Sequence, residues 1–194
     1  MRKALLVMDM QEITVGRNHA PQFHYPADLI EKVNAVILEN SDKPYDEDEK
    51  TELVDGKYDY GKNMSLAGRG TLIVYIRNLM RDSFINKFAP VKCFDGSPEA
   101  ELVSGLEKRS MYVFGKYTGD AFLNVEFASL LRDSGIDNVE IVGVDAGGCV
   151  SLTALGALRA GYKTVLNTSA IGCCMEKKRD KLYEKLKKNG AIFK

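Results

Sequence analysis

Cys149 has a residue type and a position in the chain that point to covalent chemistry. It follows an apolar run and two glycines and precedes a segment with helical periodicity, so we expect it to open a helix at the carboxyl end of a buried strand. Free N–H groups at a helix start favour negative charge, and with a nearby cation a thiol pKa falls from about 8.5 to roughly 3.5 to 7.5. The position predicts an ionised thiol, with a buried packing role as the alternative.

Asp9 and Lys116 occupy the same kind of position as Cys149. Asp9 directly follows the apolar run Lys3–Met8, and Lys116 follows the shorter run 111–114. Ligands of open α/β sheets bind at the carboxyl ends of the strands, so we expect the three side chains to converge there. The alternative for Asp9 is a solvated carboxylate at the end of a strand.

A carboxylate, a cation and a thiol in one place fit the nucleophilic cleavage of a carbonyl compound. A thiolate attacks a carbonyl carbon and forms a thioester. Asp9 would take the thiol proton and return it to the leaving amine, and Lys116 would favour both the thiolate and the carboxylate. The turn before Cys149, residues 145–148, can direct backbone N–H groups at the tetrahedral oxyanion.

The elements that must position these residues alternate between strands and helices. Apolar runs predict strands over residues 3–8, 71–76, 111–114, 139–144, 163–167 and 191–193. Helical periodicity and capping residues predict helices over 28–40, 97–106, 121–134, 149–160 and 177–189. Because parallel neighbours need crossovers, this order predicts an α/β fold: a three-layer α/β/α, doubly wound, mostly parallel sheet of six strands.

Composition limits the classes of function. Lys and Arg total 27 and Asp and Glu total 27, so no net charge draws the chain to nucleic acid or to an anionic membrane. No apolar run reaches the roughly 18 residues of a membrane span. The four cysteines lack disulfide-framework spacing, which indicates a reducing compartment. We therefore expect a soluble cytoplasmic protein with a small-molecule substrate, no nucleic acid partner and no membrane partner.

The chain has the length of one domain, and we expect a single domain over 1–194. Residues 41–69 carry an acidic block and polar runs with weak periodicity, which predict a surface insertion that is mostly loop. His19 and His24 lack the further ligands of a metal site. We expect no metal and no cofactor.

A family resemblance is carried by Asp9-Met10-Gln11, Gly115-Lys116-Tyr117 with Ala121-Phe122, Gly143-Val144 with Cys149-Val150 and Thr153-Ala154, and Ala160-Gly161-Tyr162. In order, these motifs resemble the isochorismatase-like cysteine hydrolases, which include nicotinamidases, N-carbamoylsarcosine amidases and ureidoacrylate amidases. The resemblance covers the first strand and nearly all of 111–194. It implies a Rossmann- or flavodoxin-like sheet and assembly as a homodimer or homotetramer.

The resemblance also implies roles for particular residues. Asp9, Lys116 and Cys149 would form a catalytic triad, and the N–H groups of Asp145 and Cys149 would form the oxyanion hole. The peptide bond between Val144 and Asp145 would be cis.

The chain also departs from the nicotinamidase pattern. Nicotinamidases carry an Asp-x-His metal motif after the second strand, where this chain has Arg77-Asn78-Leu79-Met80, and no later histidine follows. By position alone, the predicted substrate-binding residues are Gln11, Phe23, Asn78, Tyr117 and Ala146.

The leading hypothesis is a cysteine hydrolase, an amidase that cleaves a C–N bond of a small amide or carbamoyl compound. One alternative within the fold is isochorismatase-type hydrolysis of a vinyl ether, which needs general acid catalysis more than a nucleophile. Another is a noncatalytic small-molecule binding module that uses 143–148 as an anion-binding turn. The phosphate-binding patterns GxGxxG and GxxxxGK[ST] are absent from this turn.

Overall fold

A computed structural model of the chain describes residues 2–41, 53–54, 57–58, 70–84, 86–88 and 91–194. The strands are β1 (Lys3–Met8), β2 (Leu53–Val54), β3 (Lys57–Tyr58), β4 (Thr71–Asn78), β5 (Val113–Lys116), β6 (Asn138–Gly143), β7 (Lys163–Ile171) and β8 (Ile192–Phe193). The α-helices are α1 (Glu12–Val15), α2 (Leu29–Asn40), α4 (Val125–Asp133), α5 (Cys149–Arg159) and α6 (Glu176–Lys188). Short 3-10 turns are η1 (Asn86–Phe88), η2 (Pro98–Ala100) and η3 (Ala121–Leu123).

Six strands form one sheet in the order β5-β4-β1-β6-β7-β8, and each neighbouring pair is parallel. This order confirms the predicted doubly wound α/β sheet, with β1 at its centre. β2 and β3 form a separate antiparallel pair inside the predicted insertion 41–69. The rest of that insertion, residues 42–52, 55–56 and 59–69, lies outside the described residues.

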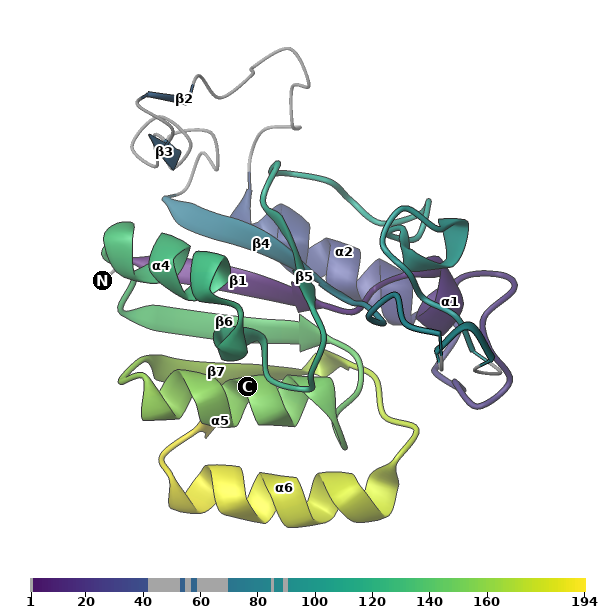
Figure 1. The fold of residues 1–194 in the computed structure, drawn as a ribbon. Coiled ribbons are helices and arrows are strands. Elements are labelled where there is room, and N and C mark those ends of the chain that lie inside the picture. The colour runs from purple at the N-terminus through teal and green to yellow at the C-terminus, as the bar shows by residue number, and fades with distance from the viewer. Residues whose placement is uncertain (1, 42–52, 55–56, 59–69, 85, 89–90) are drawn as a thin grey trace.

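Helices cover both faces of the sheet, as Figure 1 shows. Along β1, Leu6 and Met8 belong to a core shared with α4, α5 and α6, whereas Leu5 and Val7 belong to a core shared with α2. All four side chains are fully buried. A strand covered on both faces has no polar face, which explains why β1 is one continuous apolar run. Within the described ranges, no helix is long and apolar enough to cross a membrane.

The helix predicted over 97–106 is wrong. Only the single turn η2 forms, and the chain then runs extended beside the segment that follows β1. The N–H of Val103 donates to the carbonyl of Met10 at 2.9 Å, and Leu102 forms an antiparallel bridge with Gln11. This pairing still buries Leu102 and Val103 in the α2-side core, so the apolar spacing that favoured a helix is satisfied without one.

The helix predicted over 121–134 is divided into η3 and α4. Asn124 separates them: its side chain accepts from the N–H of Phe127 at 3.0 Å and caps α4. The Asn124 amide also donates to the carbonyl of Gly115 at 2.8 Å, which ties the start of α4 to β5. The break therefore anchors the helix to the strand that carries Lys116.

Candidate active site

The centre of the sheet is a topological switch point. β1 and β6 are neighbours, but α2 after β1 and α5 after β6 cover opposite faces. In open α/β sheets such a point opens a crevice at the carboxyl ends of the strands. Asp9 directly follows β1, Cys149 begins α5, and Lys116 is the last residue of β5.

Asp9 leaves β1 in a left-handed backbone conformation, with φ of 50°. Aspartate visits this region more readily than most residues that carry a Cβ. The N–H of Asp9 donates to the carbonyl of Ile76 at 2.9 Å, and the hydroxyl of Thr14 in α1 donates to the carbonyl of Asp9 at 2.5 Å. α1 and β4 thus fix the backbone from which the carboxylate extends.

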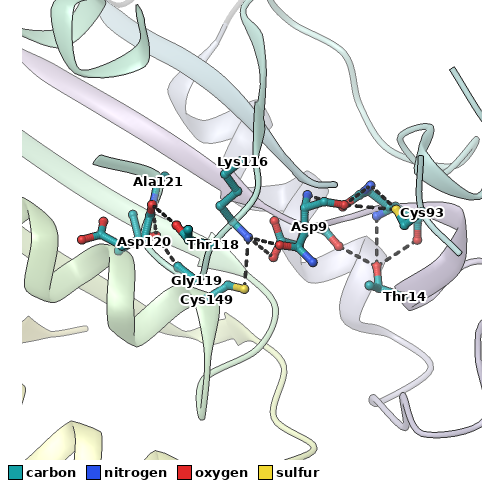
Figure 2. A network of polar contacts seen from close by, with 12 residues as sticks. Asp9, Thr14, Cys93, Lys116, Thr118, Gly119, Asp120, Ala121 and Cys149 are labelled. Carbon is teal, nitrogen blue, oxygen red and sulfur yellow. Dashed lines mark hydrogen bonds and ion pairs between the residues drawn. The ribbon is translucent and has the colours of Figure 1, made fainter. Parts of the chain in front are cut away.

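The ammonium group of Lys116 brings the three predicted catalytic residues together (Figure 2). Nζ donates to Asp9 Oδ2 at 2.9 Å, to Asn78 Oδ1 at 2.9 Å and to Cys149 Sγ at 3.1 Å. Lys116 is 2% exposed and Asp9 is 3% exposed, so their charges meet away from solvent. An ammonium group has three donors, and here each has an acceptor. The side chain of Lys116 is therefore held in one orientation.

Burial and the neighbouring charges shift the pKa of Lys116 and the pKa of Cys149. Burial lowers the pKa of Lys116, but the negative charge of Asp9 and the contact with Cys149 outweigh it and hold that pKa above its usual value. The pKa of the Cys149 thiol is raised to about 12, because burial and the charge of Asp9 raise it by more than Lys116 lowers it. The prediction of an ionised thiol is therefore wrong for the resting site, because the helix start and Lys116 do not outweigh burial beside a carboxylate.

Two backbone N–H groups next to the thiol are free to donate hydrogen bonds to a ligand. Within the part of the chain that the structure describes, neither the N–H of Asp145 nor that of Cys149 has a hydrogen-bond partner. The carbonyl of Asp145 accepts from the N–H groups of Gly148 at 3.0 Å and Val150 at 3.2 Å, which closes the turn in front of α5. The Val144–Asp145 peptide bond is cis. The free N–H groups are the pair that the family resemblance implies for an oxyanion hole.

Two of the predicted substrate-binding residues, Gln11 and Ala146, are buried and hydrogen-bonded within the protein. Gln11 is fully buried; its amide donates to the carbonyl of Ala100 at 2.9 Å, and its side-chain oxygen accepts from the N–H of Asn78 at 2.7 Å. Ala146 is 1% exposed; its N–H donates to Gly172 and its carbonyl accepts from Ser151. Gln11 and Ala146 therefore hold the site together through these bonds, and their substrate contacts stay predictions.

Asn78, Phe23 and Tyr117 lie in different surroundings. Asn78 is a partner of Lys116, as described above. Phe23 stacks on Tyr25 and lines a cavity of about 220 Å³ beside α1 and α2. Tyr117 is 50% exposed and lies with Lys116 along an open cavity of about 470 Å³, with the Arg81 guanidinium 5.3 Å from its ring centre. Substrate contacts of these three residues stay predictions.

Thr14 and Thr153 are site-forming residues that the sequence interpretation did not single out for a role. Thr14 holds Asp9, as described above. Thr153 in α5 accepts from the N–H of Ala121 at 3.0 Å and donates to the carbonyl of Gly119 at 3.3 Å. The loop after β5 is thereby tied to the helix that begins at Cys149. The sequence signal for Thr153 was a polar residue among the apolar residues of the helix predicted over 149–160, and the structure buries it.

The sheet and its switch-point cluster define an α/β protein with a candidate catalytic centre, and known proteins resemble this chain in sequence and in fold. Residues 65–193 match the isochorismatase domain model. A maleamate amidohydrolase of Pseudomonas putida is 27% identical over 79 residues, which is 40% of this chain and 37% of that protein. An isochorismatase-like hydrolase of Alkaliphilus metalliredigens superposes with a TM-score of 0.75 at 19% identity, over 100% of this chain and 94% of that chain. The pyrazinamidase of Pyrococcus horikoshii in complex with zinc superposes with a TM-score of 0.71 at 24% identity, over 100% and 99%.

The chain belongs to the isochorismatase family and is a hydrolase. The matched region contains Lys116 and Cys149, whereas Asp9 lies before it. The described residues do not fit a zinc site of the Asp-x-His kind. In the described ranges no three His, Cys, Asp or Glu side chains are grouped to hold a metal ion, and the Asn78 oxygen accepts from Lys116.

Proposed function

We propose that the protein is a cysteine amidase that hydrolyses the C–N bond of a small amide or carbamoyl compound through a thioester on Cys149. The observation that carries this proposal is the contact of one buried ammonium group, Lys116 Nζ, with both Asp9 and Cys149. The names of two relatives, a maleamate amidohydrolase and a pyrazinamidase, support amide cleavage. Cleavage of other bonds occurs on the same fold, so the mechanism has to come from this chain's own residues.

Asp9 acts as the general base for the attack. The thiol of Cys149 keeps its proton in the resting site because its pKa is raised to about 12 by burial and by Asp9. Oδ2 of Asp9 is bonded to Lys116, but Oδ1 is buried and has no hydrogen-bond partner among the described residues. Oδ1 can therefore take the thiol proton while the sulfur attacks the carbonyl carbon. Lys116 stabilises the sulfur as its negative charge develops.

The new C–S bond turns the carbonyl oxygen into an oxyanion, which the free N–H groups of Asp145 and Cys149 are available to bind. The C–N bond then breaks, and the proton held by Asp9 goes to the leaving nitrogen. Asp9 is again a carboxylate and can take a proton from the water that attacks the thioester. The C–S bond breaks, the proton returns to the sulfur, and the balance is amide plus water giving acid plus ammonia or amine.

Ammonia release from a panel of amides tests this proposal. The panel contains maleamate, pyrazinamide, nicotinamide and N-carbamoylsarcosine, each with and without a chelator, and isochorismate is assayed in parallel. We expect release from at least one compound and no effect of the chelator, because no step needs a metal. Turnover of isochorismate with no ammonia from any amide would instead support vinyl-ether hydrolysis.

Asp9→Asn should separate thiol reactivity from catalysis. The asparagine removes the negative charge that raises the pKa of Cys149 and leaves Lys116, which lowers it. We therefore expect alkylation of Cys149 by iodoacetamide at pH 7 to become several-fold faster, while amide hydrolysis is lost with its base. In the wild type, the alkylation rate should still be rising with pH above 9, because the thiol pKa is near 12.

Mass spectrometry of the labelled protein assigns the modification to Cys149 and gives its rate. Asp133→Asn, which removes a surface carboxylate on α4, is the matched control and should not change the rate. Slower labelling in Asp9→Asn would contradict the role of Asp9 as the carboxylate that keeps the thiol protonated.

A further inference from the structure

The side chain of Asp145 joins two loops at the carboxyl edge of the sheet. The first is the oxyanion turn, residues 145–149, and the second is the β7–α6 loop, residues 172–175. Oδ1 of Asp145 accepts from the N–H of Gly147 in its own turn at 2.7 Å. Oδ2 accepts from the N–H of Cys174 in the other loop at 2.5 Å. Asp145 is only 6% exposed, so both bonds are shielded from water.

The two loops approach so closely that side chains are excluded between them. A Cβ on Gly147 would come to 2.7 Å from the Cβ of Met175, and one on Gly148 would lie 3.0 Å from its Cε. The N–H of Ala146 donates to the carbonyl of Gly172 at 2.9 Å. The Asp145 carboxylate adds a side-chain link between the same two loops through the N–H of Cys174.

An ionised carboxylate is well accommodated at this position. α5 begins at Cys149 and α6 begins at Glu176, so the N-terminal ends of two helices flank the oxyanion turn. Helix N-termini favour negative charge, and hydrogen bonds to an ionised acceptor are stronger than neutral ones. The carboxylate therefore forms a firm link between the two loops, and the backbone N–H of the same residue is one of the two free donors.

We propose that the Asp145 carboxylate is a positioning residue that holds the oxyanion turn against the β7–α6 loop and so fixes the N–H groups that bind the oxyanion. This role rests on the proposed function and adds the side chain of Asp145 to the backbone donor already assigned. Without the carboxylate, the turn would keep Cys149 at the start of α5 but lose the link that aims the two donors. The thiol should remain reactive while stabilisation of a tetrahedral adduct weakens.

Reversible aldehyde binding measures this effect without any turnover. An aldehyde carbonyl adds the Cys149 sulfur and gives a hemithioacetal whose oxygen occupies the oxyanion hole, and the adduct blocks iodoacetamide. The probes are propanal and benzaldehyde, and their affinity is the concentration that halves the alkylation rate of Cys149. We expect Asp145→Ala to weaken both affinities by about 10-fold to 100-fold, since a lost oxyanion donor costs about 100-fold or more.

Further variants separate positioning from general damage to the fold. Asp145→Asn keeps one oxygen acceptor, so its aldehyde affinity should fall between those of wild type and Asp145→Ala. If the alanine variant does not fold, the aldehyde affinity of Asp145→Asn tests the positioning role. Alkylation without aldehyde should stay within about twofold of wild type, because Asp145 does not touch the thiol. Glu140→Gln alters another buried, hydrogen-bonded carboxylate, in β6, and should leave aldehyde affinity unchanged.

Each outcome has a distinct meaning. Wild-type aldehyde affinity in both Asp145 variants would overturn the positioning role, as would weakening of the same size in Glu140→Gln. No protection of Cys149 by either aldehyde in the wild type would overturn both this role and the oxyanion hole. Adduct formation that depends on Asp145, in a protein that hydrolyses no amide, would overturn the proposed function and leave the positioning role standing.

Discussion

Cys149→Ala should reduce amide hydrolysis by at least about 10⁴-fold, because removal of a nucleophile leaves only binding and oxyanion stabilisation. Cys149→Ser should also be severely impaired, since a hydroxyl holds its proton more tightly than a thiol. The Cys149 side chain is partly exposed at the first residue of α5 and lies against the edge of the core, so either small replacement changes little packing. Far-UV circular dichroism should therefore be unchanged while kcat falls.

The loss must be specific to this thiol. Cys173→Ala is the matched control, because Cys173 is a partly exposed free cysteine that makes no contact with Lys116. It should keep kcat far above that of Cys149→Ala. Acid quenching of wild-type turnover followed by mass spectrometry should find an acyl group on Cys149. Retained activity of Cys149→Ala on a vinyl ether, together with loss in Asp9→Ala, would instead support general acid catalysis without a nucleophile.

The parts of the structure that could be predicted from the sequence are those that local pattern determines. β1 is buried on both faces, so Lys3–Met8 contains one apolar run and its limits are visible in the sequence. The start of α5 is marked by the glycines before Cys149, and α5 begins at that residue. The convergence of Asp9, Lys116 and Cys149 then follows from the rule that parallel strands share a carboxyl edge.

The remaining features depend on contacts between distant segments. The 97–106 segment has the apolar spacing of a helix, but it pairs with Met10 and Gln11. The sequence around 97–106 cannot indicate this partner, because it lies about 90 residues earlier in the chain. Gln11 looks like a pocket residue by position, yet its amide is used by Ala100 and Asn78. The protonated thiol of Cys149 follows from its partial burial beside the carboxylate of Asp9, which the chain order does not reveal.

Lys116→Met should destabilise the fold as well as abolish hydrolysis. The Lys116 and Asp9 side chains are 1% and 5% exposed, and their charged atoms are 2.9 Å apart. Removing one partner of a buried ion pair leaves the other charge unpaired, which costs about 3 to 5 kcal/mol of the free energy of unfolding. The measurement is urea unfolding of both proteins near pH 7, alongside kcat on the substrate identified by the ammonia assay.

The double variant Asp9→Asn/Lys116→Met separates the two effects. It removes both charges at once and keeps side chains of similar size, so most of the lost stability should return, since replacing a whole buried pair is often nearly neutral. Hydrolysis should not return, because both the base and the ammonium group are gone. If the double variant remained as unstable as Lys116→Met, the cost would come from packing and not from an unpaired charge.

Lys3→Met is the matched control at the opposite end of β1, the strand that leads into Asp9. Lys3 opens β1 and pairs with the buried Glu140 in β6, whereas Asp9 directly follows the last residue of β1. The control breaks an ion pair of the same central strand and should lower the free energy of unfolding, while kcat stays at the wild-type value at temperatures where the protein is folded. A fall in kcat in Lys3→Met that matched Lys116→Met would mean that activity reports the stability of β1. Loss of activity in Lys116→Met alone would place the ammonium group in the chemistry, because each variant breaks a buried ion pair at one end of β1 and only Lys116 lies at the end that carries Asp9.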